Sequence, residues 1–293
     1  MEPEVLENYR KAGRILEEVL RDASPRVQVG ASLLEMAEFV EDSIRSKGAE
    51  PAFPCNISLD RAAAHYTPSP RDTSRFGENM VKLDVGVHVD GYVADAAVTV
   101  DLGGHPDLVE ASEAALEAAL ELIGPGVRTG EIGSAIEKAI MGYGYKPVSN
   151  LTGHGLQRYE AHAEPAMPNR AMEKGVILKP GDVVAIEPFA TNGSGRISEA
   201  PTTEIYGFSM QRPVRLPQAR VLMKEIAERY KTLPFARRWL KGERVEYALQ
   251  QLLRAGAVHR YPVLWEVEGA LVSQAEATVV ILDEGIEIIT RQG

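Results

Sequence analysis

The stretch from Lys82 to Val100, KLDVGVHVDGYVADAAVTV, carries three aspartates in what otherwise alternates like β-structure. Asp90 and Gly91 are a strong signal for a two-residue hairpin turn, so the stretch predicts two paired antiparallel strands. Aspartate is a poor strand former, and a buried carboxylate needs a partner or a metal ion. Any fold of this chain must therefore give a partner or a metal ion to Asp84 and Asp95, one in each strand.

The turn also sets the register of this hairpin. With a two-residue turn, Asp84 lies opposite Ala97. Asp95 then lies opposite Gly86, on the same face of the pair. The two carboxylates become diagonal neighbours, about 7–8 Å apart at Cα and within reach of a shared ion. A divalent cation would remove their repulsion; alternatively, each aspartate takes a backbone or arginine partner at a sheet edge.

The composition is that of an acidic globular protein. Of 293 residues, 44% are apolar, and the net charge is −10, which makes nucleic acid an unlikely partner because phosphates attract Lys and Arg. Cys55 is the single cysteine, so an intrachain disulfide and a cysteine-based zinc site are excluded. The N-terminal stretch is charged and amphipathic, and no apolar run reaches the ~20 residues of a membrane span. We expect a cytoplasmic protein with no membrane contact.

Hydrophobic periodicity predicts an α+β fold. Helices are expected over residues 4–23, 33–47, 107–123 and 132–143, a short strand within 51–59 and a loop over 61–72.

An internal similarity links the two helix pairs. The stretch SPRVQVG at 24–30 resembles GPGVRTG at 124–130, with Gly30 placed on Gly130, and 39–51 then resembles 135–147. Chance similarity between amphipathic helices is the alternative. If the repeat is real, two similar halves pack around a pseudo-twofold axis, with a site where their sheets meet.

Residues 207–268 interrupt this pattern. They read as two or three Arg-rich helices followed by a short hairpin, which resembles a small winged-helix module. We therefore expect a main domain of residues 1–206 plus 269–293 and an inserted helical subdomain of residues 207–268.

Three more residues extend the acidic set. His154 lies between glycines in TGHGL, Glu187 in the apolar stretch GDVVAIEPFA, and Glu276 in LVSQAEATVVIL. A lone histidine of this kind is commonly a hydrogen-bonded structural residue. Together with Asp84 and Asp95, however, the set suits a pair of Mn²⁺, Co²⁺, Fe²⁺ or Zn²⁺ ions. Two such ions can polarise a carbonyl, which is hydrolase chemistry on an amide or ester.

The remaining histidines are less informative. His65 in AAHYTP and His162 in YEAHAE could be further ligands, substrate contacts or surface residues, and spacing leaves these options open. His88, His105 and His259 read as ordinary residues.

The order Asp84, Asp95, His154, Glu187, Glu276 resembles the five metal ligands of the methionine aminopeptidases. The motifs AAHYTP, GHGLQRYEAHAEPAMPN and AIEPFA, together with the insertion, are similar to the type II branch and its short archaeal members. The resemblance covers essentially the whole chain. It implies the pita-bread fold, in which two related α+β halves enclose a dinuclear metal site.

The resemblance also implies residue roles. Asp84 would bind one metal ion, Asp95 and Glu276 would bridge both, and His154 and Glu187 would complete the second. A bridging water or hydroxide would attack the carbonyl of the first methionine of a nascent chain, when the second residue is small. Glu187 is the best-placed proton shuttle, since such a water needs a base within hydrogen-bond reach.

The resemblance assigns the substrate contacts as well. His65 and His162 would contact the scissile peptide and stabilise the tetrahedral intermediate. The methionine side chain would meet apolar positions, for which aromatic walls are suitable. These positions are Phe53, Ala161, Phe189 and Tyr261. Core packing is the alternative for the two phenylalanines.

One departure from the family stands beside the last ligand. The family usually reads Phe-Glu-His-Thr, whereas this chain has Ala275 and Ala277 on either side of Glu276. Groups around a ligand orient it, and losing them commonly costs about 10–100-fold in metal affinity or activity.

Two other readings compete with an aminopeptidase. A prolidase-like metallopeptidase shares the five ligands but usually carries an extra N-terminal domain, and a non-catalytic pita-bread adaptor would have no reason to keep four buried carboxylates. The partners implied by the resemblance are the N-termini of nascent polypeptides, with the ribosome as a further candidate, and the implied state is a monomer.

Overall fold

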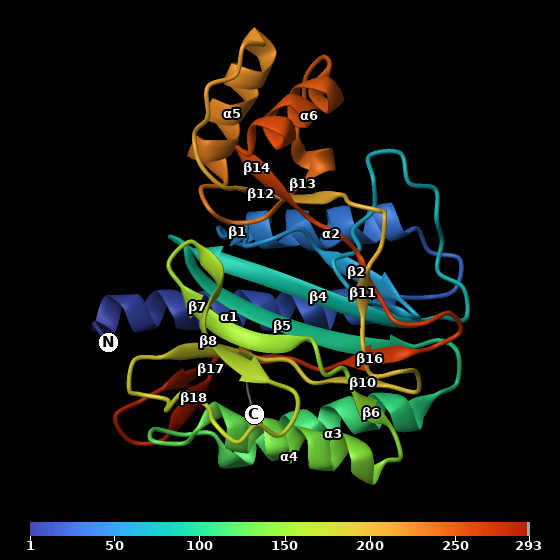
Figure 1. Cartoon of the computed structure of the whole chain (residues 1–293), viewed down its shortest axis with the longest axis vertical. Helices are drawn as coiled ribbons and strands as arrows, with labels where there is room; N and C mark the ends of the chain where they lie inside the picture. Colours follow the sequence, from blue (N-terminus) through green and yellow to red (C-terminus); the bar gives the residue numbers. More distant parts are fainter. Residues whose placement is uncertain (292–293) are drawn as a thin grey trace.

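The computed structural model describes residues 1–291, and two pairs of helices frame its sheets (Figure 1). The helices are α1 (Pro3–Ala23), α2 (Leu33–Ser46), α3 (Pro106–Leu122), α4 (Thr129–Gly142), α5 (Pro217–Arg229) and α6 (Val245–Ala255), with 3-10 turns η1 (Ser24–Arg26) and η2 (Arg237–Trp239). The predicted helices are confirmed, except that α4 begins three residues earlier than expected.

The first half is built on the long aspartate hairpin. β4 (Met80–Val89) pairs with β5 (Tyr92–Asp101), and β1 (Glu50–Pro51) and β2 (Asn56–Leu59) complete this sheet on the other edge of β4. Asp84 lies opposite Ala97 and Gly86 opposite Asp95, so the predicted register is confirmed. Helix α1 packs across β4 and β5 through an apolar stripe that includes the fully buried Leu16.

The second half has a five-stranded sheet in the order β18-β17-β9-β7-β8. Its strands are β7 (Thr152–Gln157), β8 (Glu160–Pro168), β9 (Val183–Ile186), β17 (Ala277–Ile281) and β18 (Ile286–Ile288). Helices α3 and α4 pack against each other, and their apolar faces join this sheet in one buried core. In Figure 1 this helix pair lies at the bottom, with the β4–β5 hairpin across the middle.

The two halves repeat a local hydrogen-bonding pattern. Gly30 and Gly126 both have positive φ angles, 88° and 89°. Gly30 N–H donates to the carbonyl of Phe76, and Gly126 N–H donates to that of Leu178. The predicted equivalence of Gly30 with Gly130 is therefore wrong, because Gly130 already lies inside α4. What repeats is a left-handed glycine turn three residues before a helix.

Two three-stranded sheets lie beside the sheets of the two halves. One contains β6 (Lys146–Pro147), β10 (Phe189–Thr191) and β16 (Val272–Gln274). The other contains β3 (Ala62–Ala64), β11 (Ser198–Glu199) and β15 (Leu264–Trp265). The loop predicted over 61–72 is thus partly strand, because β3 gains a partner distant in sequence, β15.

Residues between Tyr206 and Val258 form an apolar core of their own around α5 and α6, at the top of Figure 1. β12 (Ile205–Phe208) pairs with both β13 (Phe235–Ala236) and β14 (Val258–Tyr261). The predicted closing hairpin is wrong, since β14 pairs with β12 while β15 joins the sheet of β3. Among residues 1–291, no helix is both long and apolar enough to cross a membrane.

Candidate metal centre

The five predicted ligands come from both halves and line one cavity of about 340 Å³. Asp84 is on β4 and Asp95 on β5, whereas His154 is on β7. Glu187 follows β9, and Glu276 lies between β16 and β17. The sequence separates these residues by up to 192 positions, and the fold brings them to the junction of the two halves.

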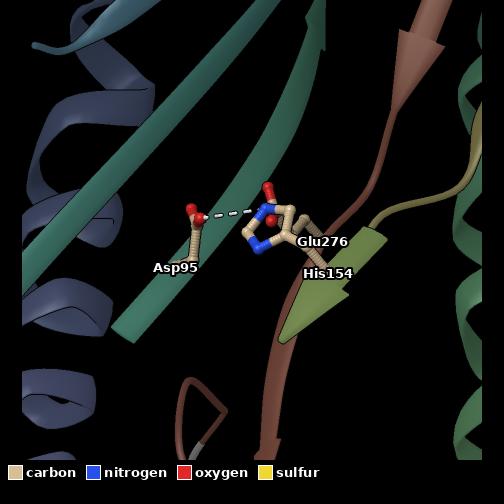
Figure 2. Close-up of side chains that lie close together, drawn as sticks. All are labelled: Asp95, His154 and Glu276. Atoms are coloured by element: carbon tan, nitrogen blue, oxygen red, sulfur yellow. Dashed lines mark ion pairs between the residues drawn. The ribbon is translucent and has the colours of Figure 1, made fainter. Parts of the chain in front are cut away.

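Three of these side chains form the tightest group (Figure 2). One ligand atom from each of Asp95, His154 and Glu276 lies within 4.8 Å of the others. His154 Nε2 is 3.8 Å from Asp95 Oδ2 and 3.6 Å from Glu187 Oε1. The spacing of one imidazole nitrogen among carboxylate oxygens is that of a metal-binding donor set.

The segment that carries Glu276 runs along the free edge of β5. Glu276 N–H donates to Ala97 O at 3.1 Å. The Thr278 hydroxyl donates to Asp95 O at 2.7 Å and accepts from Asp95 N–H at 2.8 Å. Thr99 makes the same double contact with the backbone of Gln274. These contacts join the two sheets at the level of the carboxylates, which explains why Glu276 reaches Asp95.

Burial disfavours the ionised form of the carboxyl groups in the metal-free protein. It raises the pKa of Asp84 to about 7. Burial, and then the charges of neighbouring carboxylates, raise the pKa values of Asp95 and Glu276 well above the usual range, and burial and Asp84 do the same for Glu187. Burial lowers the pKa of His154 to about 3, so its ring is neutral at pH 7 and able to bind a metal.

The donor set fits divalent cations. Asp84 Oδ1 and Asp95 Oδ1 are buried and have no hydrogen-bond partner within the described residues. A buried carboxylate oxygen without a donor is costly, and a cation removes that cost. The oxygen-rich composition with one imidazole is compatible with divalent-metal binding.

Two amide side chains that the sequence did not single out support this set. Gln274 Nε2 lies 3.4 Å from Glu187 Oε2 and 3.3 Å from Glu276 Oε2. Asn56 Nδ2 lies 3.5 Å from Asp84 Oδ2, across the β2–β4 pair. An isolated Asn or Gln in a strand has no sequence signal of its own, and the pairing of β2 with β4 that places Asn56 opposite Asp84 is visible only in the structure.

The two remaining candidate histidines also line the cavity. His65 has a left-handed backbone, with φ at 65°, and its Nδ1 lies 3.2 Å from Pro262 O. The ring of His162 is 4.6 Å from that of His154, and Tyr261 packs against both His65 and His162. His162 is exposed, whereas His65 and Tyr261 are half-buried.

Three of the four predicted methionine contacts, Phe53, Phe189 and Tyr261, line the same cavity. Ala161 is buried in the core of the first half and is not among the lining residues. Phe53 fits because Gly86 has no side chain: a Cβ there would lie 2.2 Å from Phe53 Cε1. The cavity thus has an acidic floor and partly aromatic walls.

The small residues around Glu276 are closely packed. Ala277 is fully buried opposite Ile186 and belongs to the core under α3 and α4. Ala275 is 5% exposed, and its N–H donates to Pro188 O at 3.3 Å. The backbone at Glu276 is therefore held by hydrogen bonds on both sides despite its small neighbours.

Comparison with known proteins agrees with this site. The family described as metallopeptidase family M24 matches residues 7–215. A methionine aminopeptidase of Archaeoglobus fulgidus is 52% identical over 99% of this chain and 100% of its own length. One of Methanocaldococcus jannaschii is 48% identical, with the same coverage.

Solved structures show the same fold at low sequence identity. A thermophilic Arx1 has a TM-score of 0.89 at 21% identity and covers 100% of this chain and 92% of its own. A Thermotoga maritima methionine aminopeptidase has a TM-score of 0.74 at 22% identity, covering 100% and 98%. A Pyrococcus furiosus prolidase has a TM-score of 0.65 at 20% identity, but only 65% of the prolidase is covered.

The class defined by this fold and site is that of the pita-bread metallopeptidases. The chain belongs to metallopeptidase family M24, in the branch of the methionine aminopeptidases.

Proposed function

We propose that this enzyme removes the N-terminal methionine of polypeptides in a metal-dependent reaction. The observation that carries the proposal is the convergence of four carboxylates and one imidazole on a cavity with aromatic walls. The relatives named methionine aminopeptidases support it over nearly the full length of the chain.

Two divalent cations would be held by Asp84, Asp95, His154, Glu187 and Glu276. When bound, they supply Lewis acidity to the scissile carbonyl and to the attacking water. Glu187 is the proposed proton carrier: it takes a proton from the water and passes it to the leaving amine, a role commonly worth about 10²–10⁴-fold in rate.

His65 has a defined hydrogen-bonding role in this proposal. The Pro262 carbonyl can only accept, so Nδ1 of His65 carries the proton. Burial lowers the pKa of His65 to about 4, so the ring is neutral at pH 7 and Nε2 is an acceptor. His65 would accept from the scissile N–H, while His162 would donate to the carbonyl oxygen.

Phe53, Phe189 and Tyr261, which line the cavity, would receive the methionine side chain, because a flexible thioether packs well on aromatic rings. The proposal extends to a shallow site for a small second residue, to action on nascent polypeptides in the cytoplasm and at the ribosome, and to a monomeric enzyme. It also treats residues 207–268 as an inserted subdomain. These extensions rest on the resemblance.

The test is methionine release from the peptide Met-Ala-Ser by chelator-stripped protein, with and without added Mn²⁺ or Co²⁺. We expect release only with metal, and no release from Met-Lys-Ser, because a long second residue does not fit. Absence of release with every divalent metal would refute the peptidase, whereas equal cleavage of both peptides would refute only the small second site.

A further inference from the structure

A buried ion pair links the first half to the inserted segment, away from the metal ligands. Glu41, in the middle of α2, is 2% exposed, and Arg238, in η2, is 7% exposed. Arg238 Nη2 donates to Glu41 Oε1, and Trp239 Nε1 donates to Glu41 Oε2 at 2.6 Å. Removing water from two charges is costly, so a buried ion pair alone is weak evidence for a stabilising role. Its further hydrogen bonds indicate what this pair holds in place.

Two hydrogen bonds connect the ion pair to Thr67 and Cys55, which lie close in sequence to residues of the cavity. Arg238 Nη1 donates to Thr67 Oγ1 at 2.6 Å, and the Thr67 hydroxyl donates to Cys55 O at 2.7 Å. Glu41 Oε1 also accepts from Cys55 N–H at 3.2 Å. Both backbone polar groups of Cys55 are therefore held by this set, which we term the Glu41–Arg238 network: Glu41, Cys55, Thr67, Arg238 and Trp239.

This network holds the backbone of two segments that contribute residues to the cavity, one around Cys55 and one around Thr67. Cys55 lies two residues after Phe53 and directly before Asn56, the partner of Asp84. Thr67 lies two residues after His65, whose left-handed backbone conformation is unfavourable for a residue other than glycine and must be held by its surroundings. A bond from Ile57 N to Tyr66 O ties the two segments together at 2.7 Å.

On the other side, the turn η2 that carries Arg238 also holds part of the cavity wall. Arg237 N–H donates to Glu204 O at 2.8 Å, directly before Ile205. Ile205 pairs with Tyr261, and both line the cavity, as does Pro234. The ring centroids of Tyr261 and His65 are 5.6 Å apart. A shift of η2 would therefore move Tyr261 relative to His65.

We propose that Arg238 and Glu41 are positioning residues, which hold the His65 segment and the Tyr261 wall in register with the metal ligands. The inserted segment is then a working part of the substrate site. This inference rests on the proposed function for its kinetic test, because it concerns how the peptide is held over the metal centre. Within residues 1–291, neither residue hydrogen-bonds to a proposed metal ligand, so metal binding and peptide turnover should separate.

The main variant is Arg238→Met, assayed on Met-Ala-Ser at saturating Mn²⁺. A displacement of about 1 Å can cost on the order of 100-fold, so we expect kcat/KM to fall about 100-fold, through both a higher KM and a lower kcat. The Mn²⁺ Kd, measured by calorimetry, should stay within about twofold of the parent. Arg238→Lys should be intermediate, since a point charge cannot reach both Glu41 and Thr67.

The matched control is Glu246→Gln in the same segment. Glu246 pairs with Arg237, which is adjacent to Arg238, but its side chain is 68% exposed. Surface pairs contribute little, so kcat/KM should stay within about twofold of the parent.

A double variant, Glu41→Leu with Arg238→Met, covers the case in which Arg238→Met fails to fold. Replacing both charges with apolar groups commonly preserves or raises stability. We expect this variant to fold but to keep the low kcat/KM, because Cys55 N–H loses Glu41 as its acceptor and the Thr67 hydroxyl loses Arg238 as its donor.

A second readout does not depend on activity. In metal-free protein, hydrogen exchange at Cys55 and over residues 65–67 should be faster in the network variants than in the parent or Glu246→Gln. If the parent releases no methionine, the proposed function fails, while exchange still tests the network. Parent-like kcat and KM in a folded network variant, unchanged exchange, or loss of Mn²⁺ affinity in step with activity would each overturn the positioning role.

Discussion

Metal affinity should fall steeply as the pH is lowered from 8 to 6. A carboxylate binds a cation in its ionised form, so a proton on the site competes with the metal. Burial raises the pKa of Asp84 to about 7, which places this competition near neutrality. Burial in the folded, metal-free protein favours the protonated form of Asp84. Lowering the pH therefore reduces the fraction of Asp84 that is ionised and able to bind the cation.

The magnitude follows from that value. A group with a pKa of about 7 is roughly 90% ionised at pH 8 and roughly 10% at pH 6, so Asp84 alone weakens binding about tenfold, or ~1.4 kcal/mol. Burial also raises the pKa values of Asp95, Glu187 and Glu276, which makes the dependence steeper. His154 does not offset it, since its pKa of about 3 lies below this window.

Calorimetric titration of metal-free protein with Mn²⁺ at pH 6, 7 and 8 would measure the effect. Two buffers of different ionisation enthalpy at each pH give the number of protons released. Asp90→Asn is the control, because Asp90 is an exposed carboxylate paired with Arg158 outside the site. A Kd that does not change between pH 6 and 8, with no proton release, would refute the protonated metal-free state.

Three substitutions test separate parts of the structure. Glu276→Gln should retain the backbone bond to Ala97 and the fold, yet lower Mn²⁺ affinity and methionine release at least about 10-fold; parent-like affinity would show that Glu276 is no ligand. Ala277→His restores the family residue at a fully buried position, and overpacking should cost about 1–3 kcal/mol in urea unfolding; unchanged stability with higher activity would contradict this. Leu16→Ala leaves a cavity between α1 and the β4–β5 hairpin and should cost about 2–5 kcal/mol in the same assay, so a loss below 1 kcal/mol would mean that the helix relaxes onto the sheet.

The sequence was most informative where local rules decide the structure. A two-residue turn and the period of a strand were enough to pair Asp84 with Ala97 correctly. The helices were also placed well, because an apolar stripe and its end signals are local. Only α4 began early, at Thr129.

The predictions failed where contacts between segments distant in the sequence determine the structure. β14 pairs with β12, which lies some fifty residues earlier, so adjacency wrongly suggested a hairpin with β15. Gly30 was matched to Gly130 by residue identity, whereas the structure repeats the φ angle and the hydrogen bond of Gly126. Gln274 was missed because its contacts with Glu187 and Glu276 exist only after the sheets have met.

The position of the aspartates in Val-rich strands follows from how those sheets meet. Among the strands of residues 1–291, β5 pairs only with β4, so its other edge would leave backbone groups unpaired next to Asp95. The Thr278 hydroxyl satisfies both the N–H and the carbonyl of Asp95, and Glu276 N–H bonds to Ala97. The contact that seals this edge therefore brings a carboxylate from the second half beside those of the first. Carboxylates of both halves therefore gather at this junction, where a bound cation would offset their repulsion.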